Sequence, residues 1–189
     1  CSIWVVQQLY EGLVALDPEN AIVPALALEW EIDSTAKVYT FRLRNASFHN
    51  GKPLAADDVV YSLNRLRDAK VASPGSWVVE DIASLRTVDA STVEIVLKQP
   101  NSTFLSLLAM PFCSVVPKDE ITLTKSPVGT GPFKFHVWHY GEKLVLHKNE
   151  TYWRIDGNGA QLPYLDGISI SFLTDQQSAF LEYLRGNFD

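Results

Sequence analysis

A chain of 189 residues, 47% of them hydrophobic and 20% charged, can bury one sizeable core or two small ones, and this composition excludes a disordered protein. The formal net charge of −6 argues against nucleic acid as a partner, because neutralising phosphates requires a basic face. The most apolar stretch, 104–116, is interrupted by polar residues and Pro111 and is too short to span a bilayer.

The first third of the chain predicts one helix followed by strands. Ile3, Val6 and Leu9 recur at helical spacing, which predicts an amphipathic helix from residue 3 that ends at or just after Gly12. Residues 17–20 read as a turn, and residues 25–32 as an apolar patch that ends in a strand.

Residues 39–68 predict a strand, a tight turn and a helix. Apolar and polar residues alternate over 39–44, which is typical of a strand with one buried face. Asn50-Gly51 is a strong turn signal. Apolar residues then recur at helical spacing from Ala56 to Leu66, with two aspartates at the positive end of the helix dipole.

The remaining segments predict hairpins, short helices and a long loop. The expected elements are a hairpin of 86–88 with 93–97, a short helix ending at Ala109, a buried strand at 114–116, a polar connection at 118–128, a hairpin of 133–138 with 144–146, a loop over 149–166, a strand at 168–172, and a helix from Asp175 to Leu184 with Gly186 as its stop. Intermixed helices and hairpins favour an α+β fold with mixed or antiparallel sheets.

No pattern in the chain predicts catalysis or a metal centre. His136, His139 and His147 lie in or beside one hairpin, but their strand positions do not favour the convergence that zinc requires. No G-x-S-x-G motif is present, and Cys113 lies among apolar residues as a small core residue would. Gly129-Thr130-Gly131 lacks the Lys of a phosphate loop, so we expect its glycines to allow a turn or a close backbone approach. We therefore expect no enzyme, no metal and no cofactor.

Several short motifs together resemble one protein family. They are Phe41, Leu43 and Arg44 with Phe48, Gly51, Pro53, Ala56, Asp58, Val59 and Ser62, then 10–13, 24–30, 129–133, 149–153, 163–166 and 185–189. In this order they are similar to the family 5 extracytoplasmic solute-binding proteins, the receptors of ABC importers for peptides, nickel chelates and some oligosaccharides. The chain departs from the family at Ala55, where a capping Thr is usual, so Asp57 is expected to cap the helix instead.

The resemblance implies part of a type II periplasmic-binding-protein fold, in which two lobes close on a ligand by hinge motion. In these terms residues 1–32 and 118–189 resemble the main subdomain of lobe I, and residues 33–117 its small subdomain, with the second lobe absent. The implied function is the substrate-binding component of an importer, for oligopeptides in the first place. A ligand-sensing domain of a transcriptional regulator is the alternative.

The resemblance also implies a location, partners and a candidate site. We expect a periplasmic or membrane-anchored protein of the cell envelope that works with ABC permease subunits, binds no nucleic acid, and is a monomer as this piece. The loop near the mouth of the family's cleft corresponds to Ser73, Gly75, Ser76 and Trp77, although Trp77 could equally serve packing. Cys1 is interpreted as internal to a longer chain, and whether it pairs with Cys113 stays open.

Overall fold

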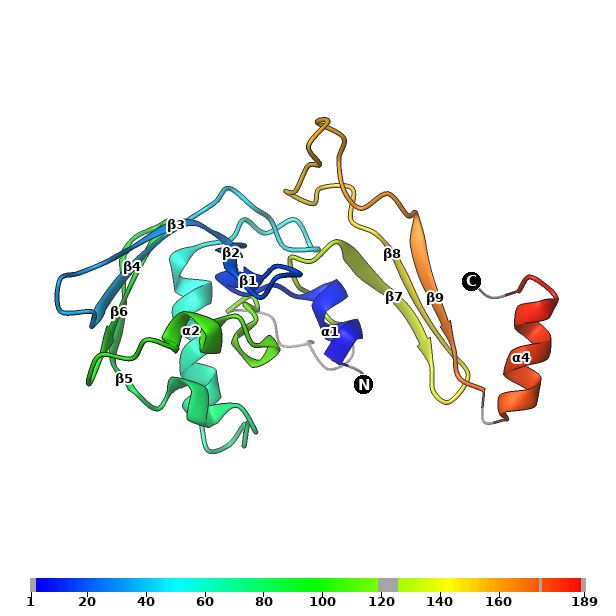
Figure 1. Ribbon diagram of the computed structural model, residues 1–189, viewed down its shortest axis with the longest axis horizontal. Helices are drawn as coiled ribbons and strands as arrows, with labels where there is room; N and C mark the ends of the chain where they lie inside the picture. The colour runs from blue at the N-terminus through cyan, green and yellow to red at the C-terminus, as the bar shows by residue number, and fades with distance from the viewer. Residues whose placement is uncertain (1–2, 119–125, 174, 188–189) are drawn as a thin grey trace.

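The computed structural model describes residues 3–118, 126–173 and 175–187. Among these residues the strands form three antiparallel sheets, flanked by short helices (Figure 1). The elements are α1 (Ile3–Leu9), β1 (Val14–Leu16), β2 (Ile22–Pro24), β3 (Ala27–Ile32), β4 (Val38–Leu43), α2 (Ala56–Arg67), η1 (Ser76–Val79), β5 (Ile82–Asp89), β6 (Thr92–Leu97), α3 (Phe104–Leu108), η2 (Pro111–Cys113), β7 (Phe133–His139), β8 (Lys143–Lys148), β9 (Gly167–Ser171) and α4 (Gln176–Leu184).

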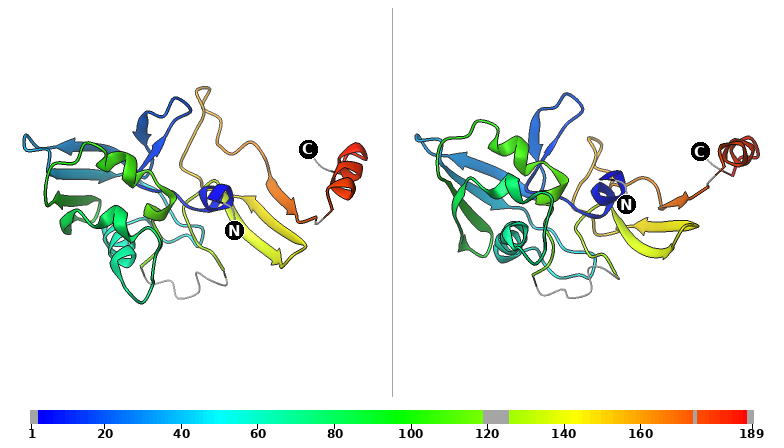
Figure 2. Two further views of the ribbon diagram at one scale, coloured as in Figure 1. Left: turned by 60° about the horizontal axis from the view of Figure 1, so that its bottom comes forward. Right: turned by 90° about the horizontal axis from the view of Figure 1, so that it is seen from below.

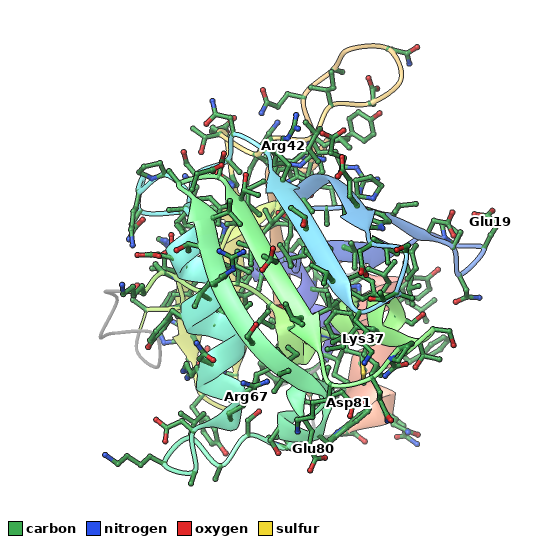
Figure 3. The ribbon with its side chains drawn as sticks, turned by 90° about the vertical axis from the view of Figure 1, so that its left-hand side faces the viewer. Glu19, Lys37, Arg42, Arg67, Glu80 and Asp81 are labelled. Atoms are coloured by element: carbon green, nitrogen blue, oxygen red, sulfur yellow. The ribbon has the colours of Figure 1, made fainter. Side chains whose placement is uncertain are left out.

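The larger sheet, in the order β3-β4-β6-β5, packs one face on α2. Tyr39, Phe41 and Leu43 of β4 are buried on that face, as the alternation predicts. Figure 3 looks onto the opposite face, where Arg42 lies, with α2 behind the sheet. The Asn50-Gly51 turn is also confirmed, because Gly51 has a φ of +84°.

The smaller sheet, in the order β7-β8-β9, packs against α1. Its core is a cluster of Val5, Leu9, Phe133, Leu144 and Leu146. Helix α4 lies beyond β9 at one end of the molecule and buries none of its residues (Figures 1 and 2). Asp175 caps this helix by accepting from the Ser178 N–H at 2.7 Å, as predicted.

The buried residues of the two sheets form two separate cores. Leu13, Val14 and Leu26 are buried in the cluster of the larger sheet, which extends along the chain to Val128. The cause is the β1–β2 hairpin, which pairs with itself and leads directly into β3 of the larger sheet. The chain therefore crosses between the cores near residues 10–12 and 129–132.

Where the chain passes between the cores, the backbone of residues 8–9 contacts the backbone of residues 129–131. The Gly131 N–H donates to the Leu9 carbonyl at 3.0 Å. A Cβ on Gly129 would lie 2.0 Å from the Leu9 oxygen, and one on Gly131 would lie 2.5 Å from the Gln8 oxygen. Only glycine fits at these two positions, so the close backbone approach expected of Gly129-Thr130-Gly131 is confirmed.

His49 holds the same segment from the side of the larger core. Its backbone N–H donates to the Gly129 carbonyl at 2.8 Å. The Gly129 N–H donates to Nδ1 of the His49 ring at 3.2 Å. Nε2 of the same ring lies 3.0 Å from the Gly131 carbonyl oxygen. A neutral imidazole with its proton on Nε2 satisfies both contacts. Burial lowers the pKa of His49 to about 4, with Lys134 acting in the same direction and the bond to Gly131 opposing it.

Three local predictions are wrong. The helix from residue 3 ends at Leu9 rather than near Gly12, because Val14 begins a strand paired with β2. Residues 114–116 form no strand; Val115 N–H donates to the Glu11 carbonyl instead. The carboxylate that caps α2 belongs to Asp58, not Asp57: its Oδ2 accepts from the Ala55 N–H at 3.0 Å.

Replacing Gly129 by alanine should destabilise the protein by about 2 kcal/mol or more, because the new methyl group would overlap a backbone oxygen that cannot rotate away. Gly157→Ala is the matched control, since a Cβ there meets nothing within 4 Å, and its effect should stay within about 0.5 kcal/mol. Chemical denaturation measures both. Equal stability of the two variants would contradict the close contact.

Stability should fall as the pH drops from about 6.5 to 4, because unfolded His49 binds a proton in that window and folded His49 does not. The lowered pKa corresponds to about 3 kcal/mol, present above pH 6.5 and lost once the pH reaches 4. His49→Gln should remove this part of the slope, measured as the free energy of unfolding at pH 7 and pH 4. A slope in His49→Gln identical to that of the unsubstituted protein would refute the role of His49.

Candidate functional site

The four predicted site residues lie in the loop between α2 and β5, but in different surroundings. Ser76 and Trp77 open η1 and are exposed, Trp77 by 51%. Ser73 is half-buried, and its hydroxyl accepts from the Gly75 N–H at 3.2 Å. Gly75 is buried against Phe112, whose side chain would lie 2.5 Å from an added Cβ. The structure thus brings Ser76 and Trp77 together, whereas Ser73 and Gly75 shape the loop.

Ser76 and Trp77 line a hollow of about 430 Å³ at the edge of the larger sheet, together with Arg67, Glu80, Ile82 and Lys98. Figure 3 shows Arg67 and Glu80 at this edge. The cations there are held by backbone carbonyls: Arg67 Nη2 donates to Val79 at 2.8 Å, and Lys98 Nζ to Glu80 at 2.7 Å. The exposed indole of Trp77 is therefore the apolar surface that this hollow offers to another molecule.

A second cluster surrounds Glu11 at the crossing between the cores. Its carboxylate accepts from the Tyr152 hydroxyl at 2.8 Å and from the Trp153 Nε1–H at 2.9 Å. Burial raises the pKa of Glu11, while these hydrogen bonds and the nearby Arg44 oppose the rise. The Arg44 guanidinium lies 3.5 Å from the centroid of the Trp153 ring, a cation–π contact.

Sequence reasoning missed the Glu11 cluster. The motifs at 10–13 and 149–153 are both visible in the sequence, but they are separated by more than a hundred residues, and no local pattern predicts that they meet. One feature of the sequence could have indicated it. Glu11 lies in an apolar segment, and a buried carboxylate needs hydrogen-bond donors, of which Tyr152 and Trp153 supply two. This cluster forms the floor of a cavity of about 260 Å³ beside α1.

The histidine and cysteine residues show no catalytic arrangement in the described part of the chain. His136 and His147 stack with ring centroids 4.0 Å apart, and His139 is paired in register with Lys143. Within residues 3–118, 126–173 and 175–187 no group of three or more His, Cys, Asp and Glu could hold a metal ion. Cys113 is buried, and burial raises the pKa of its thiol to about 12. Its pairing with Cys1 lies outside the described residues.

Among the helices of the described residues, none combines the length and the apolar character needed to cross a bilayer.

Comparison with known proteins identifies the family. The family profile described as bacterial extracellular solute-binding proteins, family 5 middle, matches residues 21–189. The periplasmic oligopeptide-binding protein OppA of Salmonella typhimurium is 34% identical over 174 residues, covering 79% of this chain and 32% of that protein. Di/tripeptide-binding protein 2 of Pseudomonas aeruginosa is 33% identical, covering 77% and 33%. The chain thus spans about a third of the length of these relatives.

Solved structures agree in fold. AgaA of Agrobacterium tumefaciens, in complex with agropinic acid, superposes with a TM-score of 0.87 at 31% identity, over 98% of this chain and 38% of that one. DppA of Helicobacter pylori, in complex with the peptide STSA, gives 0.84 at 31% identity, over 96% and 40%. These similarities confirm the predicted α+β fold. The chain belongs to the bacterial extracellular solute-binding proteins, family 5.

Proposed function

We propose that this chain is the first lobe of the substrate-binding component of an ABC importer, with oligopeptides as cargo. The observation that carries the proposal is the family match over residues 21–189, together with relatives named for binding oligopeptides and di- or tripeptides. The ligand lies between this lobe and a second one, and the lobes close on it by hinge motion. In this proposal residues 1–32 and 118–189 form the main subdomain of the lobe, and residues 33–117 form its small subdomain.

The loop with Ser73, Gly75, Ser76 and Trp77 is the proposed contribution of this lobe to ligand binding. Trp77 offers an exposed aromatic face, and Ser76 a hydroxyl beside it. Gly75 keeps the loop close to Phe112, and Ser73 fixes its turn. Side chains of this kind tolerate varied peptide sequences, because stacking and water-mediated contacts read little of the side-chain identity.

The protein works in the periplasm or anchored on the outer side of the inner membrane, next to ABC permease subunits. The relatives' names, periplasmic oligopeptide-binding protein among them, favour this location over a cytoplasmic transcriptional regulator. The net charge of −6 disfavours nucleic acid as a partner. Binding without catalysis is the proposed activity, since the relatives are solute-binding proteins rather than enzymes.

Because a clamshell receptor buries its ligand between two lobes, this chain alone should bind di- to pentapeptides weakly. Calorimetry should show no dissociation constant tighter than about 1 mM for the isolated chain. A two-lobed protein that contains this chain should bind the same peptides in the micromolar range or tighter. Micromolar binding by the chain alone would refute the need for a second lobe.

Trp77→Ala in such a two-lobed protein should weaken peptide binding about tenfold, because the aromatic platform is lost. Trp138→Ala is the matched control: Trp138 is 49% exposed but lies on β7 of the other sheet. Affinity is measured by calorimetry and folding by thermal unfolding, which should be nearly unchanged in both variants. Equal affinities in the two variants would remove Trp77 from the site.

A further inference from the structure

Two histidine rings lie against each other on the exposed face of the smaller sheet. His136 of β7 and His147 of β8 stack with their ring centroids 4.0 Å apart and their planes 16° from parallel. Both side chains are exposed. Strands β7 and β8 are hydrogen-bonded neighbours (Figure 1), so the pair connects two adjacent strands of one hairpin.

The register of the hairpin brings the two rings to the same face. The pairing with β8 shifts between Phe135 and Val137, so His136 is the extra residue of a β-bulge. Leu146 is buried in the core against α1. Because side chains alternate along a strand, the next residue, His147, lies on the opposite face of the sheet. His136 lies diagonally across from it there, in contact with its ring.

The histidine pair is open on the side of β9 and separate from the cavities of the molecule. The register partner of His147 on β9 is Gly167, which has no side chain to cover the imidazole. A Cβ at Gly167 would lie 2.7 Å from the Leu146 oxygen, so a larger residue fits there only if the backbone moves. Neither histidine lines the cavity beside α1 or the hollow at Trp77.

Two imidazoles at this separation are close to the geometry that a metal ion requires. Copper and zinc ions favour imidazole nitrogen as a protein ligand. Such an ion bonds each nitrogen at about 2.0–2.1 Å, so two nitrogens on one ion lie about 3 Å apart. The rings stand 4.0 Å apart, and tilting them about their side-chain torsions closes the difference of about 1 Å. Because the paired strands fix the backbone, only the torsions of two exposed side chains have to change.

We propose that His136 and His147 together bind one divalent ion of the copper and zinc class, with water completing its coordination. Within residues 3–118, 126–173 and 175–187 no group of three or more His, Cys, Asp and Glu could hold a metal ion, so these residues supply two ligands rather than a closed site. Cu²⁺ binds more tightly than Zn²⁺, as is general for nitrogen ligands. The ion links β7 to β8, and its binding needs no second lobe, so the site holds or fails independently of the proposed importer function.

Lys134 sets a limit to the affinity of this site. It is the register partner of His147 on β7, and it is half-buried. Its charge also acts on His49 at the crossing. An ammonium group repels a metal ion nearby, so Lys134→Gln should strengthen Cu²⁺ binding severalfold. Weaker binding in this variant would contradict the placement of the ion beside Lys134.

The test is a titration of Cu²⁺ into the protein, without an affinity tag and in a buffer that does not bind metal ions. Calorimetry should give a dissociation constant on the order of 10 µM, and electron paramagnetic resonance should show two imidazole nitrogens on the ion. Saturating Zn²⁺ should raise the melting temperature by several degrees, because it binds the folded hairpin more tightly than the unfolded chain. Absence of Cu²⁺ binding up to about 1 mM would overturn the proposal.

His136→Gln and His147→Gln should each weaken Cu²⁺ binding at least tenfold, because one imidazole is then left to hold the ion. His139→Gln is the matched control: His139 is also exposed on β7 but is paired in register with Lys143, and its loss should leave the affinity unchanged. All three side chains are exposed, so the variants should fold, which thermal unfolding without metal checks. If His136→Gln bound Cu²⁺ as tightly as the unsubstituted protein, or if His139→Gln weakened binding as much as His147→Gln, the assignment would be wrong.

Discussion

The contact of the Gly129–Gly131 backbone with Leu9 is the constraint on which the arrangement of the two cores depends. The chain leaves the smaller core after α1, builds the larger core, and returns at residues 129–132. Both passages run through the same place, and the Gly131 N–H bond to the Leu9 carbonyl joins them. A side chain at either glycine would force the backbones apart, and the two sheets would no longer be held together at this contact.

The polar side chains around this contact hydrogen-bond to the segments that meet there. His49 connects the larger core to the glycines, and the buried Asn149 donates to the Gly131 carbonyl at 3.0 Å from the other side. Glu11, just past α1, holds Tyr152 and Trp153. A buried carboxylate is costly without such donors, and with them it fixes the loop 149–166 over the crossing.

The sequence predicted elements where local physics decides and missed features that depend on distant pairing. The β4 alternation, the Gly51 turn, the α2 stripe and the Asp175 cap each follow from spacing within a few residues. The apolar spacing of residues 3–13 is equally helical, yet Val14 pairs with Pro24, and tertiary pairing overrides the pattern. Among the candidate site residues, Trp77 was chosen for its place beside a Pro-Gly loop, but the sequence left open whether it packs or binds, and its 51% exposure is known only from the structure. The cluster of Glu11 with Tyr152 and Trp153 was not predicted, because its members lie far apart in the sequence.

The two cores differ in how far they can support themselves. The larger one buries three phenylalanines, Phe41, Phe48 and Phe104, completely, whereas the smaller one relies on a few aliphatic residues and Phe133. Phe180, Tyr183 and Leu184 of α4 remain more than half exposed, so the helix gains little from burial, and the Asp175 cap acts locally. Most of the buried apolar residues among those described therefore belong to the larger core. The smaller sheet is joined to the larger core at this crossing, where Gly129 and Gly131 both pack against the Leu9 carbonyl group.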